Sequence, residues 1–408
     1  MKDKLIENLI KKEIKRQDDT LNLIPSENYV SGGVLRALGS PLTNKYAEGY
    51  PGARYYGGNA VIDEIENLCK ERALKLFKLS PRAWHVNVQA YSGSPANLAV
   101  YFGFVPFGEK IMGLRLDMGG HLTHGHKVSI TGQAWKSVQY GVNRKTELLD
   151  YSEIMKIAKR EKPKLIIAGY TAYPRIIDFK KFRKIADVVG AYFMVDMSHF
   201  AGLVAGGVYP SPFKYADVVT TTTHKTLRGP RAALIFCKKE LASKIDKAVF
   251  PGLQGGPHAN QIASTAVALY EAMQPSFKKY AKQVVKNVKA LAEELKRQGF
   301  RLVSGGTDTH LVLLDLRDKG ITGREVSDRL EAQGIIVNKN TIPFDPRPPM
   351  DPSGIRLGTP ALTTRGMKER EMKIIGNLIG EVLSRGKNVS LGVKKLCRDF
   401  PLKYSKGL

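Results

Sequence analysis

Lys225 follows a short run of apolar and β-branched residues, and this run sets the strongest limit on the architecture. The surrounding block, residues 217–231, reads DVVTTTTHKTLRGPR. Its first six residues and the Gly-Pro turn beyond them predict a buried strand over residues 217–222. Ligands of α/β sheets bind beyond the carboxyl ends of the strands, where a partly desolvated lysine can attack a carbonyl as a neutral amine. The alternative is a solvated lysine at a surface turn.

The rest of the chain supplies six more short apolar runs, separated by segments with helical periodicity. Candidate strands cover residues 84–88, 110–114, 137–140, 164–169, 191–196, 217–222 and 232–236. Strands that alternate with helices predict an α/β fold with a mostly parallel, seven-stranded sheet covered on both faces.

The pattern changes near residue 276, which predicts a second, smaller α+β domain. A long helix is followed by candidate strands at 300–303 and 310–316, a helix opened by a capping box at Thr322 and Glu325, and a last helix over 367–383. Residues 1–20 have the spacing of an amphipathic helix. We therefore predict an N-terminal arm at 1–35, a large ligand-binding domain at 36–275 and a small domain at 276–408.

The composition of the 408 residues is that of a globular protein, apart from a formal net charge of +26. A basic surface attracts nucleic acid, but the lysines and arginines are scattered and no RNA-binding aromatic motif occurs, so solvated helix faces or anionic small molecules are the alternatives. No apolar run approaches the ~18 residues of a membrane helix, and the charged start lacks a signal-peptide core. Three widely spaced cysteines form no disulfide or metal pattern. We expect a cytoplasmic protein.

A phosphate site is predicted where the strand at 84–88 leads into SGSPANLAVY. Ser94 is expected to be the N-cap of a helix and Pro95 its first residue. Ser92, Gly93 and Ser94 would then offer hydroxyl and N–H groups at the positive end of the helix, where a dianionic phosphate binds. No Walker A or GxGxxG motif occurs, which argues against a nucleotide.

Asp196 ends the apolar run AYFMVD and, once buried, needs a cationic or hydrogen-bonding partner. The protonated pyridine nitrogen of pyridoxal phosphate fits this need, because protonation makes the ring an electron sink. A carboxylate bonded to local backbone is the alternative. The order of phosphate loop, acid and lysine on strands of one sheet favours their acting together.

Three histidines, His121, His124 and His126, lie within MGGHLTHGHK. Their spacing is loose and no cysteine or carboxylate pattern accompanies it, so we predict no metal site. An imidazole stacked on a cofactor ring, or ordinary polar histidines, fit better. The segment 42–59, LTNKYAEGYPGARYYGGN, has neither helical nor strand periodicity, and is interpreted as a functional loop or a solvated surface loop.

Several blocks together resemble serine hydroxymethyltransferase over residues 20 to 370, in that family's order. They read SENYVS, KYAEGYPGARYYGGN, VQAYSGSPANLAVY, GGHLTHG, VDMSHFAGLVAGGVYP, THKTLRGPR, FPGLQGGPH, NKNTIPFDP and SGIRLGTPALTTRG. The resemblance implies a homodimeric pyridoxal-phosphate enzyme of the aspartate-aminotransferase fold (fold type I). It would convert L-serine and tetrahydrofolate reversibly to glycine and 5,10-methylenetetrahydrofolate, through a Schiff base on Lys225.

The resemblance also implies roles for individual residues on the cofactor side. Lys225 would form the Schiff base, Asp196 would pair with the pyridine nitrogen, and His121 would stack on the ring. The remaining cofactor contacts would come from Ser92, Gly93, Ser94, His199, Tyr46, Gly255 and Gly256, with Gly255 and Gly256 supplied by the partner subunit.

On the substrate side, Arg356 and Ser26 would hold the carboxylate, which suits a bidentate guanidinium. Glu48, donated across the dimer, would handle the proton of the substrate hydroxyl. Tyr55 and Tyr56 would line the pocket, Thr222 and His224 would flank the lysine, and Leu116, Gly120, Leu122 and Asn340 would face the folate.

Two rival interpretations remain open at this point. One is a threonine-aldolase-like lyase of the same fold, which would cleave serine without folate. The other is a basic RNA-binding protein with a decayed site. Tetrahydrofolate or a modified pterin, and a dimer or a tetramer, also remain open.

Overall fold

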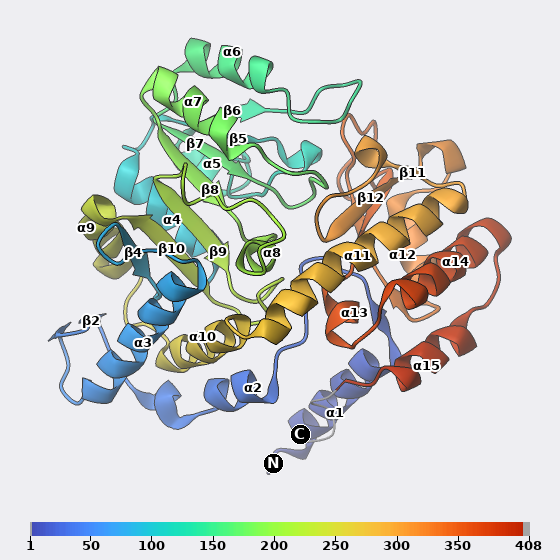
Figure 1. Ribbon diagram of the computed structural model, residues 1–408, viewed down its shortest axis with the longest axis horizontal. Helices are drawn as coiled ribbons and strands as arrows, with labels where there is room; N and C mark the ends of the chain where they lie inside the picture. The colour runs from blue at the N-terminus through green and yellow to red at the C-terminus, as the bar shows by residue number, and fades with distance from the viewer. Residues whose placement is uncertain (1, 403–408) are drawn as a thin grey trace. The chain divides into compact units, whose positions relative to one another are not determined.

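The computed structural model describes residues 2–402, which form two compact units (Figure 1). One unit runs from Val30 to Ala281, and the other joins the chain before Val30 to the chain after Ala281. Each unit has its own sheet and its own core.

A seven-stranded sheet organises the unit from Val30 to Ala281. Its strands are β4 (Trp84–Asn87), β5 (Lys110–Leu114), β6 (Lys136–Tyr140), β7 (Leu165–Gly169), β8 (Tyr192–Asp196), β9 (Val218–Thr222) and β10 (Ala233–Lys238). Their order is β4-β10-β9-β8-β7-β5-β6, and β10 runs opposite to the other six strands. All seven predicted strands are confirmed to within two residues, and the mostly parallel α/β fold is confirmed with them.

The helices of this unit precede, connect or follow the strands of the sheet. They are α2 (Gly32–Leu38), α3 (Ala60–Leu76), α4 (Gly93–Phe104), α5 (Ile130–Ala134), α6 (Tyr151–Glu161), α7 (Phe179–Val189), α8 (Ala201–Ala205), α9 (Ala242–Lys247) and α10 (Ala259–Ala272), and α11 (Pro275–Arg297) begins here. A two-residue hairpin, β2 (Gly49–Tyr50) with β3 (Ala53–Arg54), stands between α2 and α3.

Alternation along β8 shows how the sheet is covered on both faces. Met194 belongs to the core that α4 and α9 form on one face, together with Ala96 and Ile245. Its neighbour Phe193 points to the other face, where its ring stacks on Phe182 of α7 with centroids 5.8 Å apart. Because successive side chains of a strand point to opposite faces, the continuous apolar run of β8 is buried on both sides.

The other unit is an α+β structure around a four-stranded antiparallel sheet with the order β11-β12-β15-β14. Its elements are α1 (Lys4–Asp19), β1 (Leu21–Asn22), β11 (Arg301–Leu302), β12 (Leu311–Asp315), α12 (Gly323–Glu331), β13 (Ile335–Ile336), β14 (Asn338–Asn340), β15 (Gly354–Gly358), α13 (Pro360–Thr364), α14 (Glu369–Arg385) and α15 (Ser390–Asp399). β1 pairs in parallel with β13, which ties the N-terminal segment to this unit. The sequence did not predict α15.

The predicted start of α12 is confirmed, because the Thr322 hydroxyl accepts a hydrogen bond from the backbone N–H of Glu325. The carboxylate of Glu325 pairs with Arg329 one turn later. Within residues 2–402, every helix is too short or too polar to cross a lipid bilayer.

Candidate active site

Asp196 is the last residue of β8 and lies buried at the carboxyl end of the sheet. Its Oδ1 accepts a hydrogen bond from the backbone N–H of Ser198, at 3.0 Å. Its Oδ2 accepts one from Asn97 Nδ2 at 2.8 Å and lies 3.1 Å from His124 Nε2. An ionised carboxylate offers about four acceptor positions, so these three contacts leave room for one further donor.

The electrostatic surroundings keep Asp196 ionised. Burial alone would raise the pKa of this carboxyl, but the hydrogen bond to His124 lowers it. Electrostatic interactions with His124, His121 and Lys225 lower it further, and together they hold the pKa well below its usual range. The predicted acid, ring histidine and lysine therefore share one electrostatic environment.

Asn97 orients both the acid and the predicted stacking histidine. Asn97 is buried on α4, where its Nδ2 donates to Asp196 and to Thr123 Oγ1 (2.9 Å), and its Oδ1 accepts from Thr220 Oγ1 (2.7 Å). Thr123 Oγ1 lies in turn 2.7 Å from His121 Nδ1. A buried amide with all these contacts fixes the positions of two functional groups at once.

The roles of Asn97, Thr123 and His124 were missed by the sequence reasoning. The available signal was weak: Asn97 is a polar residue within the apolar helix NLAVYFGF. A polar side chain on a buried helix face requires a partner, although the sequence does not say which.

Lys225 lies three residues beyond β9, and its side chain is buried. Burial, together with the positive charges of Lys225 and Arg231, lowers the pKa of His224 to about 3, so this imidazole is neutral near neutral pH. Thr222, the last residue of β9, donates its backbone N–H to Ser198 Oγ at 3.0 Å. The lysine thus follows a strand end whose backbone is fixed to the segment after Asp196.

The segment predicted to hold a phosphate begins a helix, but the expected helix cap is wrong. The N-cap of α4 is Ser92, with extended backbone, and the helix begins at Gly93 rather than after Ser94. Pro95 is consequently the third helical residue, where its missing N–H costs no intrahelical bond. The free N–H groups of Gly93 and Ser94 therefore lie at the positive end of α4. A Cβ built on Gly93 would come within 2.7 Å of Thr222 Cγ2, so only glycine fits here.

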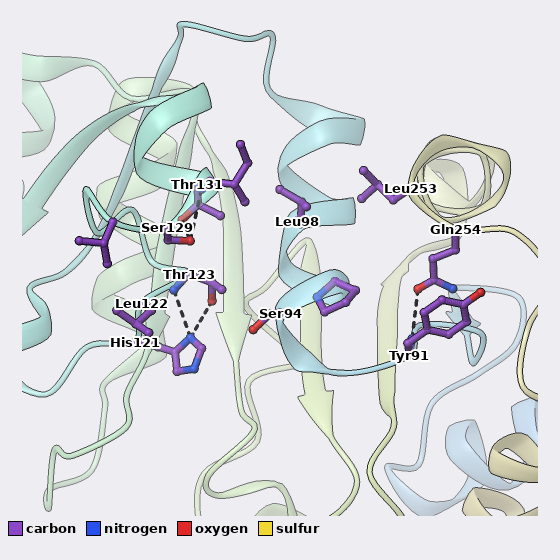
Figure 2. Close-up of a pocket in the computed structure, with 13 residues that line it drawn as sticks. Tyr91, Ser94, Leu98, His121, Leu122, Thr123, Ser129, Thr131, Leu253 and Gln254 are labelled. Carbon is purple, nitrogen blue, oxygen red and sulfur yellow. Dashed lines mark hydrogen bonds between the residues drawn. The ribbon is translucent and has the colours of Figure 1, made fainter.

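A pocket of about 490 Å³ opens beside the phosphate segment. Figure 2 shows Ser94 between His121 on one side and Tyr91 with Gln254 on the other. The wall is mainly apolar and consists of Tyr91, Ser94, Pro95, Leu98, His121, Leu122, Thr123, Val128, Ser129, Ile130, Thr131, Leu253 and Gln254.

The loop at 42–59 is held rigidly by Arg54. Its guanidinium donates to the carbonyls of Ala47 and Gly49, and it forms ion pairs with Asp63 (2.8 Å) and Glu66 (2.7 Å). Glu66 is fully buried, so this pair anchors the hairpin on α3. The loop therefore has a backbone fixed by Arg54, although Tyr46, Tyr55 and Tyr56 are exposed on it.

Four of the predicted site residues, Tyr46, Glu48, Gly255 and Gly256, lie together near this loop. A Cβ on Gly255 would lie 3.4 Å from Glu48 Oε1, and one on Gly256 would lie 3.7 Å from the Tyr46 ring. The negative charge of Glu48 raises the pKa of Tyr46. The rings of Tyr46 and Tyr56 meet edge to face at 4.9 Å and remain exposed, as does Tyr55.

The remaining predicted residues of this unit are dispersed around the sheet edge. His199 is buried, with its ring 6.3 Å from that of Tyr170. Gly120 has no room for a side chain, since a Cβ would lie 2.0 Å from the Leu114 carbonyl oxygen. Leu116 is half-buried, while Leu122 is exposed at the pocket wall.

Arg356, Ser26 and Asn340 belong to the other unit. Arg356 is buried on β15, where burial lowers its pKa to about 10 and its Nε donates to Asn338 Oδ1 at 3.2 Å. Asn340 ends β14, and its Nδ2 donates to the carbonyl of Thr341. Ser26 is half-buried in a turn. Among residues 2–402 no group of three or more His, Cys, Asp or Glu side chains could hold a metal ion.

Comparison with known proteins gives a consistent result over nearly the whole chain. The model of the family described as serine hydroxymethyltransferase matches residues 1–379. A serine hydroxymethyltransferase from Desulfotalea psychrophila is 56% identical over 405 residues, which cover 98% of this chain and 94% of the relative.

Proposed function

This chain belongs to the serine hydroxymethyltransferase family, and from that membership we propose how its own residues carry the reaction. It is a pyridoxal-phosphate-dependent transferase that interconverts L-serine and glycine, with tetrahydrofolate as the one-carbon acceptor. The roles of individual residues, the division into domains and the assembly are the proposed part.

The observation that carries the assignment is the open acceptor position on Asp196. Three donors occupy the other acceptor positions, and the pKa is held low, so an ionised oxygen can receive the N–H of a protonated ring nitrogen. The N–H groups at the start of α4 suit the phosphate, and the amine of Lys225 suits the aldehyde. The residues present therefore fit pyridoxal phosphate.

When bound, the cofactor withdraws electrons from the substrate Cα, which allows the bond from Cα to the hydroxymethyl group to break. The negative charge of Asp196 would keep the ring nitrogen protonated. His121, which lies 2.7 Å from Thr123 Oγ1, would stack on the ring, and Ser92, Gly93 and Ser94 at the start of α4 would hold the phosphate.

Further residues would bind serine and move its proton. The buried guanidinium of Arg356, with Ser26, would hold the substrate carboxylate. Glu48 would take the proton of the substrate hydroxyl as the one-carbon unit leaves. Tyr55, Tyr56, Thr222, His199 and the neutral His224 would surround the reacting atoms, and Leu116, Gly120, Leu122 and Asn340 would face the folate.

We further propose a homodimer in which Tyr46, Glu48, Gly255 and Gly256 of one copy complete the site of the other. These residues form one cluster around a loop that Arg54 fixes, and tyrosines of this loop are exposed. Apolar side chains that a second copy could cover are exposed on the same unit: Phe102, Phe107, Leu122, Val128, Ile130 and Leu253. Analytical ultracentrifugation would distinguish a dimer from a tetramer.

Two further assignments stay predictions. The first is the division of the chain into an arm (1–35), a cofactor-binding domain (36–275) and a small domain (276–408). In this division the cofactor binds to the domain with the seven-stranded sheet. A cytoplasmic location is supported by three free, buried cysteines, which suit a reducing compartment.

The direct test is a visible spectrum of the purified protein with pyridoxal phosphate, followed by serine cleavage with and without tetrahydrofolate. We expect a visible band of the lysine-bound cofactor and serine turnover that depends on tetrahydrofolate. Equal turnover without folate would identify a threonine-aldolase-like lyase instead. RNA retention at low salt without a visible band would indicate the RNA-binding alternative.

A further inference from the structure

We propose that Tyr91 is a positioning residue that acts across the dimer: it fixes the segment that its own subunit donates to the partner's cofactor site. The inference rests on the proposed sharing of sites between subunits. It goes beyond that proposal by naming one residue that is linked both to the phosphate segment of its own site and to the segment donated to the partner.

Tyr91 directly precedes the phosphate segment of its own subunit, because Ser92 is the N-cap of α4. Its backbone N–H donates to Gln254 Oε1 at 3.1 Å, a bond visible in Figure 2. Gln254 is buried and returns a bond from its Nε2 to the carbonyl of Gln89 at 2.8 Å. The start of the phosphate segment is thus fastened to the segment that leads into Gly255.

The side chain of Tyr91 makes a second attachment to the same segment. Its hydroxyl donates to the carbonyl oxygen of Gly256 at 2.7 Å. Its ring stacks on the imidazole of His258, with centroids 4.3 Å apart and planes 6° from parallel. Gly255 and Gly256 lack side chains to hold them in place, so these contacts restrict a segment that is otherwise free to rotate.

The attached segment reaches the residues that we assign to the partner's site. Gly255 and Gly256 lie against Glu48, and Gly256 also lies against Tyr46. Burial and the negative charge of Glu48 raise the pKa of Tyr91, which places the phenol in the field of that carboxylate. Tyr91 is therefore joined to the phosphate segment of its own subunit through the backbone. Its side chain contacts the segment with Gly255 and Gly256 that we propose is donated to the partner.

Removing the hydroxyl alone separates these two connections. Tyr91→Phe retains the ring on His258 and the backbone bond to Gln254, so the phosphate segment of the same subunit keeps its attachment. The carbonyl of Gly256 loses its donor. The net contribution of one hydrogen bond corresponds to about a three- to tenfold change in an equilibrium constant. We expect the binding of pyridoxal phosphate in the partner's site to weaken by this factor.

Mixed dimers with two affinity tags distinguish the two sites. A wild-type subunit is paired with a subunit that carries Lys225→Ala alone, or Lys225→Ala with Tyr91→Phe. Only the wild-type subunit can form the visible band of lysine-bound cofactor, so titration of this band reports one site. We expect half-saturation at about three- to tenfold more pyridoxal phosphate when the donating subunit carries Tyr91→Phe.

The reverse pairing places Tyr91→Phe in the subunit that keeps Lys225, opposite a Lys225→Ala subunit. Here the cofactor titration should match the dimer without Tyr91→Phe. The proposal would be overturned if the cofactor titration of the first pairing were unchanged. It would also be overturned if cofactor binding weakened only in the reverse pairing, or equally in both pairings. The matched control Tyr270→Phe, an exposed tyrosine on α10 beside Arg72, should change neither titration.

A separate control isolates the sharing of sites. A wild-type subunit paired with a Lys225→Ala, Glu48→Gln subunit should lose serine turnover. If turnover persists, the shared site itself is wrong, and the fault lies with the proposed assembly. An unchanged thermal midpoint of the Tyr91→Phe homodimer excludes general unfolding as the cause of weaker binding.

Discussion

The carboxylate of Asp196 shows how a charge can be stable in a buried site. Its hydrogen bonds come from the backbone of Ser198, from Asn97 on α4 and from His124 in the loop after β5. A buried carboxylate without such partners would take up a proton instead. Gly169 on the neighbouring strand allows this close packing, because a Cβ there would lie 2.5 Å from the Asp196 carbonyl oxygen.

Asp196→Asn retains the size of the side chain and removes its charge. We expect the protein to fold and to bind pyridoxal phosphate, with serine turnover reduced about 100-fold or more because the ring nitrogen is no longer held protonated. Circular dichroism, the visible band and serine turnover test the three statements separately. Turnover close to wild type would refute the role of this acid.

Asn97→Asp places a second carboxyl at hydrogen-bonding distance from Asp196. Two carboxylates so close cannot both ionise, so they share a proton, and the negative counter-charge that Asp196 offers the ring nitrogen is spread over both groups and weakened. We expect turnover to fall at least about tenfold at neutral pH. Thr220→Val removes the hydroxyl that donates to Asn97 without adding charge, and should have a smaller effect; equal losses would mean that packing, not charge, is responsible.

At the scale of elements, Arg365 joins the ends of two helices. It is buried after α13, and each of its five N–H groups can be assigned to a backbone carbonyl at 2.7 to 3.2 Å. The acceptors are Gln17, Asp18 and Thr20 at the end of α1, and Cys397 and Phe400 at the end of α15. A cation at two helix C-termini satisfies carbonyls that have no partner within the helix, and also interacts favourably with both helix dipoles.

Arg365→Met should lower the free energy of unfolding by on the order of 3 kcal/mol, because several buried carbonyls lose a charged donor. Arg365→Lys keeps the charge but has fewer N–H groups, so we expect an intermediate loss. Urea unfolding followed by circular dichroism measures both. Arg385→Met, at the exposed end of α14, is the matched control and should change stability by less than about 0.5 kcal/mol. If Arg365→Met also lowered the free energy of unfolding by less than about 0.5 kcal/mol, Arg365 would not stabilise the two helix ends as proposed.

The sequence predicted elements better than it predicted contacts between them. The seven strands were found because each is a continuous apolar run bounded by turns, and Asp196 and Lys225 were found because they follow such runs. The cap at Ser92 was missed because Ser92 and Ser94 are equivalent in sequence, and only the extended backbone of Ser92 distinguishes them. The contacts of Asn97 and Arg365 join residues far apart in the chain, which no local pattern contains.

At the scale of the whole molecule, the proposed site residues form two groups, one at the sheet edge and one at a loop. Asp196 ends β8 and Lys225 follows β9, whereas Glu48 lies between a hairpin anchored by Arg54 and the segment held by Tyr91. Rigid anchoring is useful if the loop must present its carboxylate to another copy, since an ordered group loses little freedom on assembly.

Subunit exchange tests this arrangement quantitatively. Lys225→Ala and Glu48→Gln homodimers should each be nearly inactive. If Glu48 acts in the partner's site, a mixed dimer of the two has one site with both an intact Lys225 and an intact Glu48. Random assortment makes half of the dimers mixed, so an equimolar mixture should recover about a quarter of wild-type serine turnover. A mixture of Lys225→Ala with Asp196→Asn should recover almost nothing, because both changes damage a subunit's own site and no intact site can form. If the first mixture is equally inactive, Glu48 acts within its own subunit, and the shared site is wrong.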